Sequence, residues 1–301
     1  MTSTVVPTTI APVGPAPGTT RGPLRPGHAF VVWVLGCVAA LGLWGLVYPV
    51  LIGALQEQDN QQQLFAKLRS ELSQATAPIG PTDYGKPIAL ISAPDAGIRN
   101  SVVVEGTGGS ELQQGPGHLR STVLPGQAGT SEILGRAVTF GAPFARLDQL
   151  QPGDPVTVTT GQGTFTYRVE ELRRPGQPQP VPPTDGGSRL VLATATGSGW
   201  RAHVAPTSQL YVDALLSGTS VPRPDVPLVT TPAEEQVMGV GTASLLLLVV
   251  WLQTLLLAVA GAVWLAHHWG RRRTWLVAVP TLLALAVGAS TSAAQMLPNT
   301  F

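Results

Sequence analysis

The side chains best suited to covalent chemistry are the hydroxyl groups that surround one histidine near residue 200. Thr194, Thr196, Ser198 and Ser208 carry hydroxyls, and His203 lies between them in a stretch that contains Gly and Pro. A serine or threonine becomes a nucleophile only when a base lies within hydrogen-bond reach and a donor stabilises the oxyanion. The spacing allows His203 to approach Ser198 or Ser208 but does not require it. This stretch is therefore either a catalytic cluster or a polar turn.

Thiol and metal chemistry have little support in the sequence. Cys37 is the one cysteine, which excludes an intramolecular disulfide and a four-cysteine zinc site. It lies in a charge-free apolar block, so we expect a structural role, with lipidation or a contact between membrane helices as the alternatives. The phosphate-loop, zinc-protease and α/β-hydrolase motifs are absent. We therefore expect neither a metal nor a cofactor.

Short β-branched segments between residues 85 and 217 are typical of a mainly β domain. They are bounded by Gly or Pro, and the longer ones show the alternation of half-buried strands. A small helix is expected at Pro143–Leu150. Many short strands with turns between them favour a barrel or a sandwich. The predicted strands are Ile88–Ile91, Ser101–Glu105, Ile133–Leu134, Val156–Thr160, Thr164–Leu172, Leu190–Thr194 and Leu210–Leu215.

Three long apolar blocks predict three transmembrane helices, at residues 29–55, 237–266 and 275–297. A cleaved signal peptide is the alternative to the first helix. Arg271–Arg273 lie between the second and third blocks, and Arg21 and Arg25 precede the first. Basic residues that flank membrane helices stay in the cytoplasm. Both groups predict a multi-pass cell-membrane protein with its N-terminus inside and residues 56–236 outside.

Changes in composition divide the chain into successive parts. Residues 1–28 are rich in Pro, Gly and Thr and are expected to form a disordered cytoplasmic tail. Leu64, Leu68 and Leu72 form one stripe of a stalk helix, which packs either on its own domain or on another chain. The remaining parts are membrane helix 29–55, stalk helix and linker 56–84, β domain 85–217, Pro-rich linker 218–236, membrane helix 237–266, basic cytoplasmic loop 267–274, membrane helix 275–297 and short extracellular end 298–301.

A set of motifs in the β domain resembles the sortase family, in particular its classes D and E. The motifs are Gly-Pro-Gly-His at 115–118, Leu-Pro-Gly at 124–126, Ile133–Phe144, Leu-Gln-Pro-Gly-Asp at 150–154 and Leu190–Thr196. The resemblance implies an eight-stranded β-barrel with short connecting helices, so the expected fold is an extracellular barrel plus three transmembrane α-helices. It also implies covalent catalysis, in which a cysteine thiolate attacks a sorting peptide and an amine resolves the thioester.

The positions that carry this chemistry in the family are substituted in this chain. By the resemblance, Arg136 stands at the catalytic histidine, Ala195 at the nucleophilic cysteine and Gln209 at the arginine of the last strand. Alanine forms no acyl intermediate, and an arginine of pKa above ~12 moves no proton at neutral pH. We therefore expect no catalytic residue. The expected ligand-binding cleft is lined by Arg136, Thr194, Ala195, Thr196, His203 and Gln209.

Two side chains of this region have more than one interpretation. Arg136 is expected either to bind a carboxylate in the cleft or to be solvated or paired with an acidic residue. His118 belongs to the Gly-Pro-Gly-His element and is expected to fix a loop, with a role as a base as the alternative.

These observations leave three functional hypotheses. The first is a pseudoenzyme that binds a peptide or protein at the surface of a Gram-positive-type envelope. The second is an active transpeptidase or hydrolase that uses relocated Thr, Ser and His groups, and the third is a structural subunit of a membrane complex. The expected partners are membrane lipid, a surface protein or sorting-motif peptide, and a partner sortase or complex subunit. A net charge of +1, with no basic run interleaved with aromatic residues, argues against nucleic acid.

Overall fold

The computed structural model describes residues 43–300, with gaps at residues 46, 184–185, 198–205, 207, 226, 228, 231, 233–234, 238 and 240–244. Several expected features lie outside the described residues. They are the tail 1–28, most of the expected membrane helix 29–55 with Cys37, and the side chains of Ser198 and His203.

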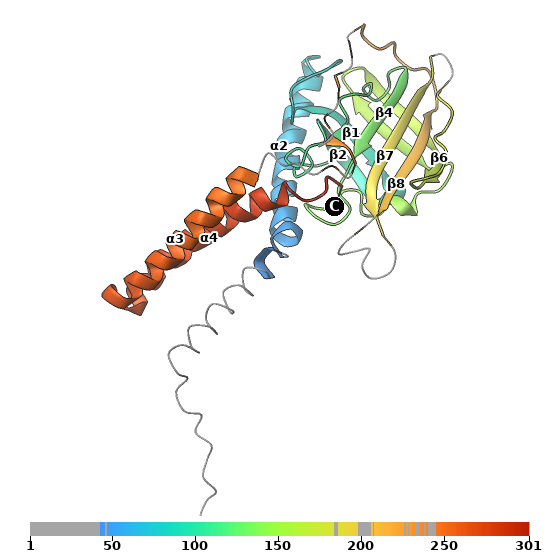
Figure 1. Ribbon diagram of the computed structural model, residues 1–301. Helices are drawn as coiled ribbons and strands as arrows, with labels where there is room; N and C mark the ends of the chain where they lie inside the picture. The colour runs from blue at the N-terminus through green and yellow to red at the C-terminus, as the bar shows by residue number, and fades with distance from the viewer. Residues whose placement is uncertain are drawn as a thin grey trace, which may run out of the picture. The chain divides into compact units, whose positions relative to one another are not determined.

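The described residues form eight strands that close into the barrel implied by the resemblance (Figure 1). The strands are β1 (Pro87–Ala93), β2 (Ile98–Glu105), β3 (Gly117–His118), β4 (Gly129–Leu134), β5 (Pro155–Thr160), β6 (Gly163–Arg173), β7 (Ser188–Thr196) and β8 (Ser208–Leu216). Their order around the barrel is β1-β2-β3-β4-β7-β8-β6-β5. The pairs β2–β3 and β4–β7 are parallel, and the other pairs are antiparallel.

Two details of the β domain differ from the sequence-based expectation. Strand β3 has only two residues, too few for an alternating pattern, and it was not among the predicted strands. The expected helix at Pro143–Leu150 is a single 3-10 turn at Leu147–Gln149. Leu147 and Leu150 are both buried in the barrel core. Their spacing suggested a helical face, but a tight turn also places both side chains inward.

The barrel interior is filled by alternate side chains of its strands. Val156 and Val158 of β5 and Phe165 and Tyr167 of β6 belong to one buried cluster. The Tyr167 hydroxyl accepts a hydrogen bond from the Gly126 amide at 2.6 Å, so its polar group is satisfied inside the core. The period-two pattern of the sequence therefore identifies the core residues of these strands.

Helix α2 (Gly53–Ser73) lies along the outside of the barrel. Leu64 and Leu68 pack against Val102 of β2, so the leucine stripe contacts its own domain. The Gln61 side chain accepts a hydrogen bond from the Val102 amide at 2.8 Å and donates one to the Val102 carbonyl at 3.1 Å. Apolar packing and these bonds together attach α2 to the barrel.

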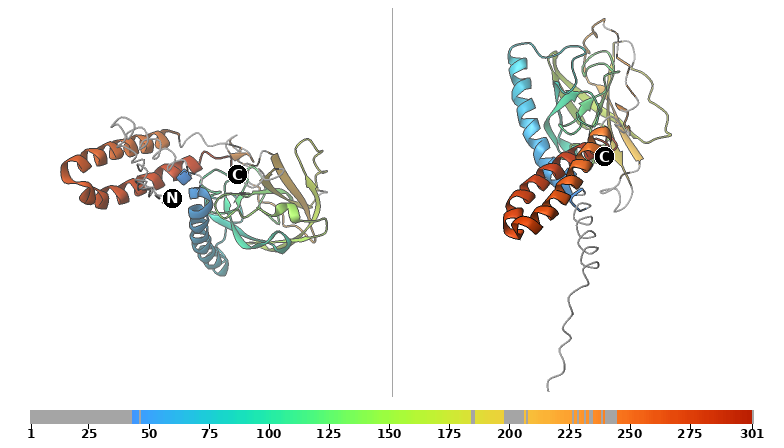
Figure 2. Two further views of the ribbon diagram at one scale, coloured as in Figure 1. Left: turned by 90° about the horizontal axis from the view of Figure 1, so that it is seen from below. Right: turned by 60° about the vertical axis from the view of Figure 1, so that its left-hand side comes forward.

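Two apolar helices follow the barrel in the chain, α3 (Leu245–Trp269) and α4 (Arg271–Ala294). They pack against each other as a hairpin (Figures 1 and 2). Among the described residues, these are the two helices long and apolar enough to cross a membrane. Many of their large apolar side chains are exposed, as a lipid environment allows. The described part of the chain thus carries two candidate membrane helices rather than the expected three.

The expected basic loop at 267–274 is almost entirely helical. Helix α3 continues to Trp269, and Arg271–Arg273 form the first turn of α4. Only Gly270 separates the two helices, and its φ of +86° lies in the region that favours glycine.

The segments on either side of the hairpin lie on the barrel. The Val221 carbonyl accepts a hydrogen bond from the Ala128 amide at 2.9 Å, so part of the expected linker 218–236 is attached. Val237, the expected first residue of a membrane helix, is buried against barrel residues. Asn299 and Thr300, in the expected extracellular end, are 0% exposed. Composition indicates none of these contacts.

We expect Leu68→Ala to destabilise the domain by about 2–5 kcal/mol, because it leaves a cavity between α2 and β2. Leu68 is 1% exposed, whereas Phe65 on the same helix is 40% exposed. Phe65→Ala is therefore the matched control and should cost much less. Urea unfolding of the full chain in detergent measures both changes, and equal losses would contradict the packing described for α2.

Candidate ligand-binding cleft

Arg136, Ala195 and Gln209, which the resemblance places at catalytic positions, lie at the same end of three adjacent strands. Ala195 of β7 and Gln209 of β8 are partners in the antiparallel register. The Gly135 amide, just beyond β4, donates a hydrogen bond to the Ala193 carbonyl of β7 at 3.0 Å. Arg136 therefore leaves β4 beside the end of β7 that carries Ala195.

The side chains at these strand ends point away from the barrel interior. Ile133, Leu192 and Leu210 belong to the core cluster, and in a strand the neighbouring side chains point to the opposite face. We call this opposite surface the outer face. Its residues are Leu134, Ala193, Ala195, Gln209 and Tyr211.

Arg136 is completely buried and holds a loop. Its guanidinium donates hydrogen bonds to the carbonyls of Leu112 at 3.1 Å and Gly109 at 3.2 Å, and to the Thr139 hydroxyl at 3.1 Å. It also lies over the Phe140 ring, 5.1 Å from the centroid. These bonds join the β4–β5 loop to the β2–β3 loop.

The surroundings of Arg136 match neither sequence-based interpretation. Its side chain is not solvated, and no acidic side chain among the described residues forms an ion pair with it. Burial lowers the pKa of Arg136 to about 10, so the group stays charged at neutral pH. Because its donors face carbonyl oxygens, the guanidinium is directed at the protein rather than at a ligand.

The other expected cleft residues offer little chemistry. Ala195 is buried and has no side-chain heteroatom. The Thr194 hydroxyl is buried and donates a hydrogen bond to the Gly135 carbonyl at 2.8 Å. Thr196 and Gln209 are partly exposed, and the Gln209 carboxamide oxygen accepts a hydrogen bond from the Tyr211 hydroxyl at 2.6 Å. His203 lies outside the described residues.

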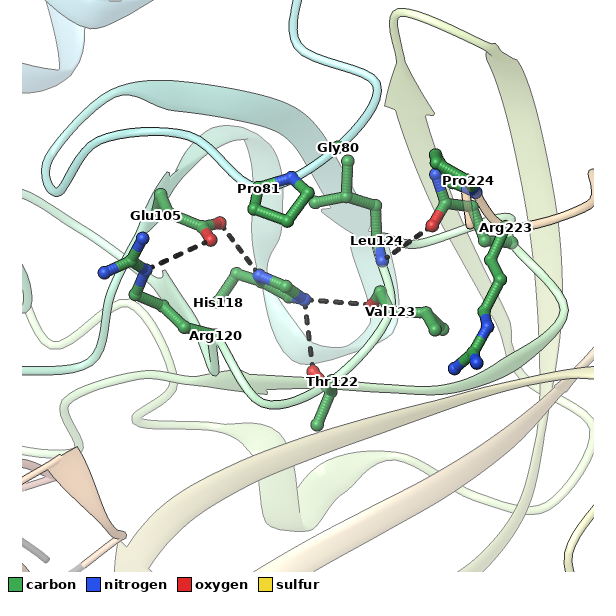
Figure 3. A pocket seen from close by; sticks show the side chains of 11 residues that line it. Gly80, Pro81, Glu105, His118, Arg120, Thr122, Val123, Leu124, Arg223 and Pro224 are labelled. Atoms are coloured by element: carbon green, nitrogen blue, oxygen red, sulfur yellow. Dashed lines mark hydrogen bonds and ion pairs between the residues drawn. The ribbon is translucent and has the colours of Figure 1, made fainter. Parts of the chain in front are cut away.

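His118 lies on β3 in a small pocket of its own. Figure 3 shows its ring between the Glu105 carboxylate, 2.9 Å from Nδ1, and the Val123 carbonyl, 2.9 Å from Nε2. A carbonyl only accepts, so Nε2–H donates to Val123, and the Thr122 hydroxyl lies 3.1 Å from the same nitrogen. Both ring nitrogens are thus occupied by bonds between β2 and the loop after β3. This geometry supports a loop-fixing role for His118.

A buried charged cluster lies on the same side of strands β4, β7 and β8 as the outer face, further along these strands. The sequence analysis did not identify it. Asp213 of β8 is completely buried and accepts a hydrogen bond from Arg173 of β6 at 3.0 Å. Val191 of β7 is in register with Asp213 on one side and with Glu132 of β4 on the other. The available signal was the presence of acidic residues inside otherwise apolar strands, but only the strand order brings them together.

Burial raises the pKa of Glu132 to about 7, with Arg173 opposing the shift and Asp213 adding to it. The folded state therefore binds this proton more tightly than the unfolded chain, whose carboxyl has the ordinary value of 4.5. The stability linked to protonated Glu132 is present below pH 4.5 and is lost as the pH rises to about 7.

We expect Glu132→Gln to leave stability nearly unchanged at low pH and to increase it by about 1–3 kcal/mol at pH 8, because glutamine does not ionise. Thermal unfolding at both pH values measures the difference from the unsubstituted chain. Asp148→Asn, at an exposed carboxyl, is the control and should show no such pH-dependent gain. A gain from Glu132→Gln that is the same at both pH values would contradict the raised pKa.

Arg136→Met should destabilise the fold by about 1–3 kcal/mol, because it leaves the carbonyls of Gly109 and Leu112 without their donors. Arg146, which is exposed, provides the control: Arg146→Met should change stability by less than about 0.5 kcal/mol. Denaturant unfolding of the full chain reports both. If Arg136→Met is as stable as the unsubstituted chain, the two loops do not depend on the guanidinium.

Comparison with known proteins gives consistent sequence matches in the barrel. A family model described as a Sortase domain matches residues 91–212. The chain is 30% identical over 88 residues to Sortase SrtE1 of Streptomyces coelicolor, and the match covers 26% of this chain and 25% of that protein. It is 30% identical over 71 residues to Sortase D of Bacillus subtilis, covering 24% and 34%. The matched segments thus span only a quarter to a third of these two relatives.

Solved structures similar to this chain include two sortases. A Sortase D5 transpeptidase of Clostridium perfringens is 22% identical with a TM-score of 0.44, covering 53% of this chain and 99% of that one. Sortase E of Streptomyces avermitilis is 29% identical with a TM-score of 0.38, covering 46% and 93%.

Proposed function

Because residues 91–212 of this chain form a sortase domain, we propose that the protein is a non-catalytic member of that family which binds a peptide or protein segment at the cell surface. The observation that carries the proposal is the register pairing of Ala195 with Gln209. The resemblance places the nucleophile and its cationic donor at these two positions. A methyl group offers no acyl acceptor, and a neutral carboxamide stabilises an oxyanion less than a charged donor does.

The geometry of the neighbouring groups does not favour relocated catalysis. The Thr194 hydroxyl is buried and already donates to a carbonyl, so it is not placed to attack a substrate. Arg136 neither moves a proton at neutral pH nor reaches out of the protein, because its donors face Leu112, Gly109 and Thr139. Both observations support a binding role over an enzymatic one.

The composition of the outer face supports a peptide as the ligand. Leu134 and Ala193 provide apolar contacts, which Val237 of this chain occupies in the structure, and Gln209 and Tyr211 provide polar groups at its edge. Peptide sites combine apolar contacts with a few polar groups that orient the backbone. A partner sortase, a surface protein or another membrane subunit would present such a segment.

The membrane hairpin supports a location at the cell membrane. The end of α4 lies beside the segment that precedes α2, because the Trp44 indole donates to the Ser290 hydroxyl at 3.0 Å. Arg271–Arg273 occupy the opposite end of α4. Basic residues at a helix end favour the cytoplasmic side, so the barrel end would face outward. In this proposal the hairpin contacts lipid and holds the barrel at the extracellular surface.

A transpeptidation assay tests the proposal. The full chain in detergent, mixed with a sorting-motif peptide and hydroxylamine as the amine acceptor, should form no hydroxamate product above the level of buffer, because position 195 has no nucleophile. Mass spectrometry of the peptide measures the product. Thr194→Ala and His203→Ala are the decisive variants: product made by the unsubstituted chain and lost in either variant would show an active enzyme with relocated groups.

Cross-linking in native membranes separates the two non-catalytic hypotheses. A peptide-binding module should cross-link through the outer face to one extended segment of a partner. A purely structural subunit should cross-link through broad surfaces of α3, α4 or the barrel, with no preference for the outer face.

A further inference from the structure

Two segments of the chain itself cover part of the outer face. One precedes α3 and the other follows α4, so both belong to the ends of the membrane hairpin. We call them together the plug, which consists of residues 235–237, 239 and 295–300. Although these residues are far apart in the sequence, they contact each other and the barrel.

The aliphatic side chain of Val237 packs on the outer face. It is 8% exposed and packs in one cluster with Leu112, Leu134 and Ala193, and the partly buried Tyr211 packs against the same cluster. Ala193 is two residues from Ala195 on the same side of β7. The contact site of Val237 is therefore next to Ala195, the position that the resemblance assigns to the nucleophile.

Asn299 and Thr300 form a turn that lies between this segment and the barrel. The Thr300 hydroxyl donates to the Val237 carbonyl at 2.7 Å, and the Asn299 amide donates to the Gly239 carbonyl at 3.1 Å. The Thr300 carbonyl accepts a hydrogen bond from the Ala137 amide at 3.0 Å. Ala137 directly follows Arg136, so a backbone bond from the barrel holds the plug beside the substituted histidine position.

Further bonds hold the first segment to the barrel. The Thr107 hydroxyl donates to the Glu235 carbonyl at 2.6 Å, and the Tyr84 hydroxyl donates to the Glu235 carboxylate at 2.7 Å. Both barrel residues lie next to β2. The plug thus satisfies main-chain and side-chain groups of the barrel in the way that a bound peptide does.

We infer that the outer face beside Ala195 is a peptide-binding groove whose resident occupant is the plug. The external ligand is a peptide segment similar in sequence to residues 295–301, and it replaces the second segment of the plug on the Ala137 amide. This inference rests on the proposed function, because it assumes that the groove binds peptides without processing them.

Covalent connection of the plug to α3 and α4 gives it an advantage over a free peptide. A tethered segment has a high effective concentration at its site, in the millimolar range for short links. When the competent, open state is a small fraction of the population, the apparent Kd of an external peptide is raised by the inverse of that fraction. Weakening the plug should therefore strengthen binding of an external copy.

The test uses the full chain in detergent and a fluorescent peptide that copies residues 295–301, Gln-Met-Leu-Pro-Asn-Thr-Phe. The variant Asn299→Ala with Thr300→Ala removes the side-chain bonds of the plug to Gln236 and Val237. It should bind the peptide at least about tenfold more tightly than the unsubstituted chain, as measured by fluorescence anisotropy. Hydrogen exchange of the amides at 136–139 should also become faster.

One control variant and one control peptide test whether the gain in affinity is specific. Thr281→Ala on α4, whose hydroxyl bonds only the Val277 carbonyl among the described residues, should bind as the unsubstituted chain does. A peptide of the same composition in scrambled order should not show the gain. Unchanged affinity in the double variant, or equal binding of the scrambled peptide, would overturn the inference. The binding experiment measures no reaction product, so its failure would not show that the protein is an enzyme. Only the transpeptidation assay tests that point.

Discussion

The buried guanidinium of Arg136 is the interaction on which the arrangement around the outer face depends. A guanidinium removed from water requires hydrogen-bond acceptors for its N–H groups, and here these are the carbonyls of Gly109 and Leu112 and the hydroxyl of Thr139. These bonds give the β4–β5 loop one position relative to the β2–β3 loop. The loop then presents the Phe140 amide to the Pro49 carbonyl at 2.9 Å and the Ala137 amide to the Thr300 carbonyl. One side chain thus organises contacts to segments before α2 and after α4.

The surroundings of Arg136 suit a structural role rather than proton transfer. A histidine that transfers protons needs contact with a substrate and a pKa near neutrality. Arg136 has neither, because it is 0% exposed and its pKa, although lowered, stays at about 10. Its planar fork of donors instead suits several carbonyl oxygens at once. Ala195 carries no reacting group, and the plug covers the neighbouring surface through Val237.

The plug connects the fold of the barrel with the membrane helices. Val237 leads into α3 and Asn299 and Thr300 follow α4, so both ends of the hairpin meet on the outer face. The bonds of the plug to Ala137 and Thr107 join the barrel to the segments that flank the hairpin. The proposed binding surface and the two apolar helices are therefore linked through the hydrogen bonds of the plug.

Much of the fold follows from patterns that are local in the sequence. Alternation in Val156–Thr160 and Thr164–Leu172 predicts strands and their buried side chains, because a strand has a period of two. Apolar length predicts α3 and α4 but not their exact ends, since Arg271–Arg273 extend a helix that composition alone would stop. A two-residue strand such as β3 has no period to detect and depends on its partners in β2 and β4.

By itself, the sequence determines that position 195 has no heteroatom, that the only thiol lies in an apolar block, and that two long apolar helices follow a barrel of short strands. These properties depend on residue identity and on local periodicity. Tertiary structure alone decides that Arg136 is buried rather than solvated, that Glu132 and Asp213 share one sheet surface, and that Asn299 and Thr300 contact Val237. Such contacts join residues that are many positions apart, and chain crossing and strand order, not local pattern, bring them within hydrogen-bond distance.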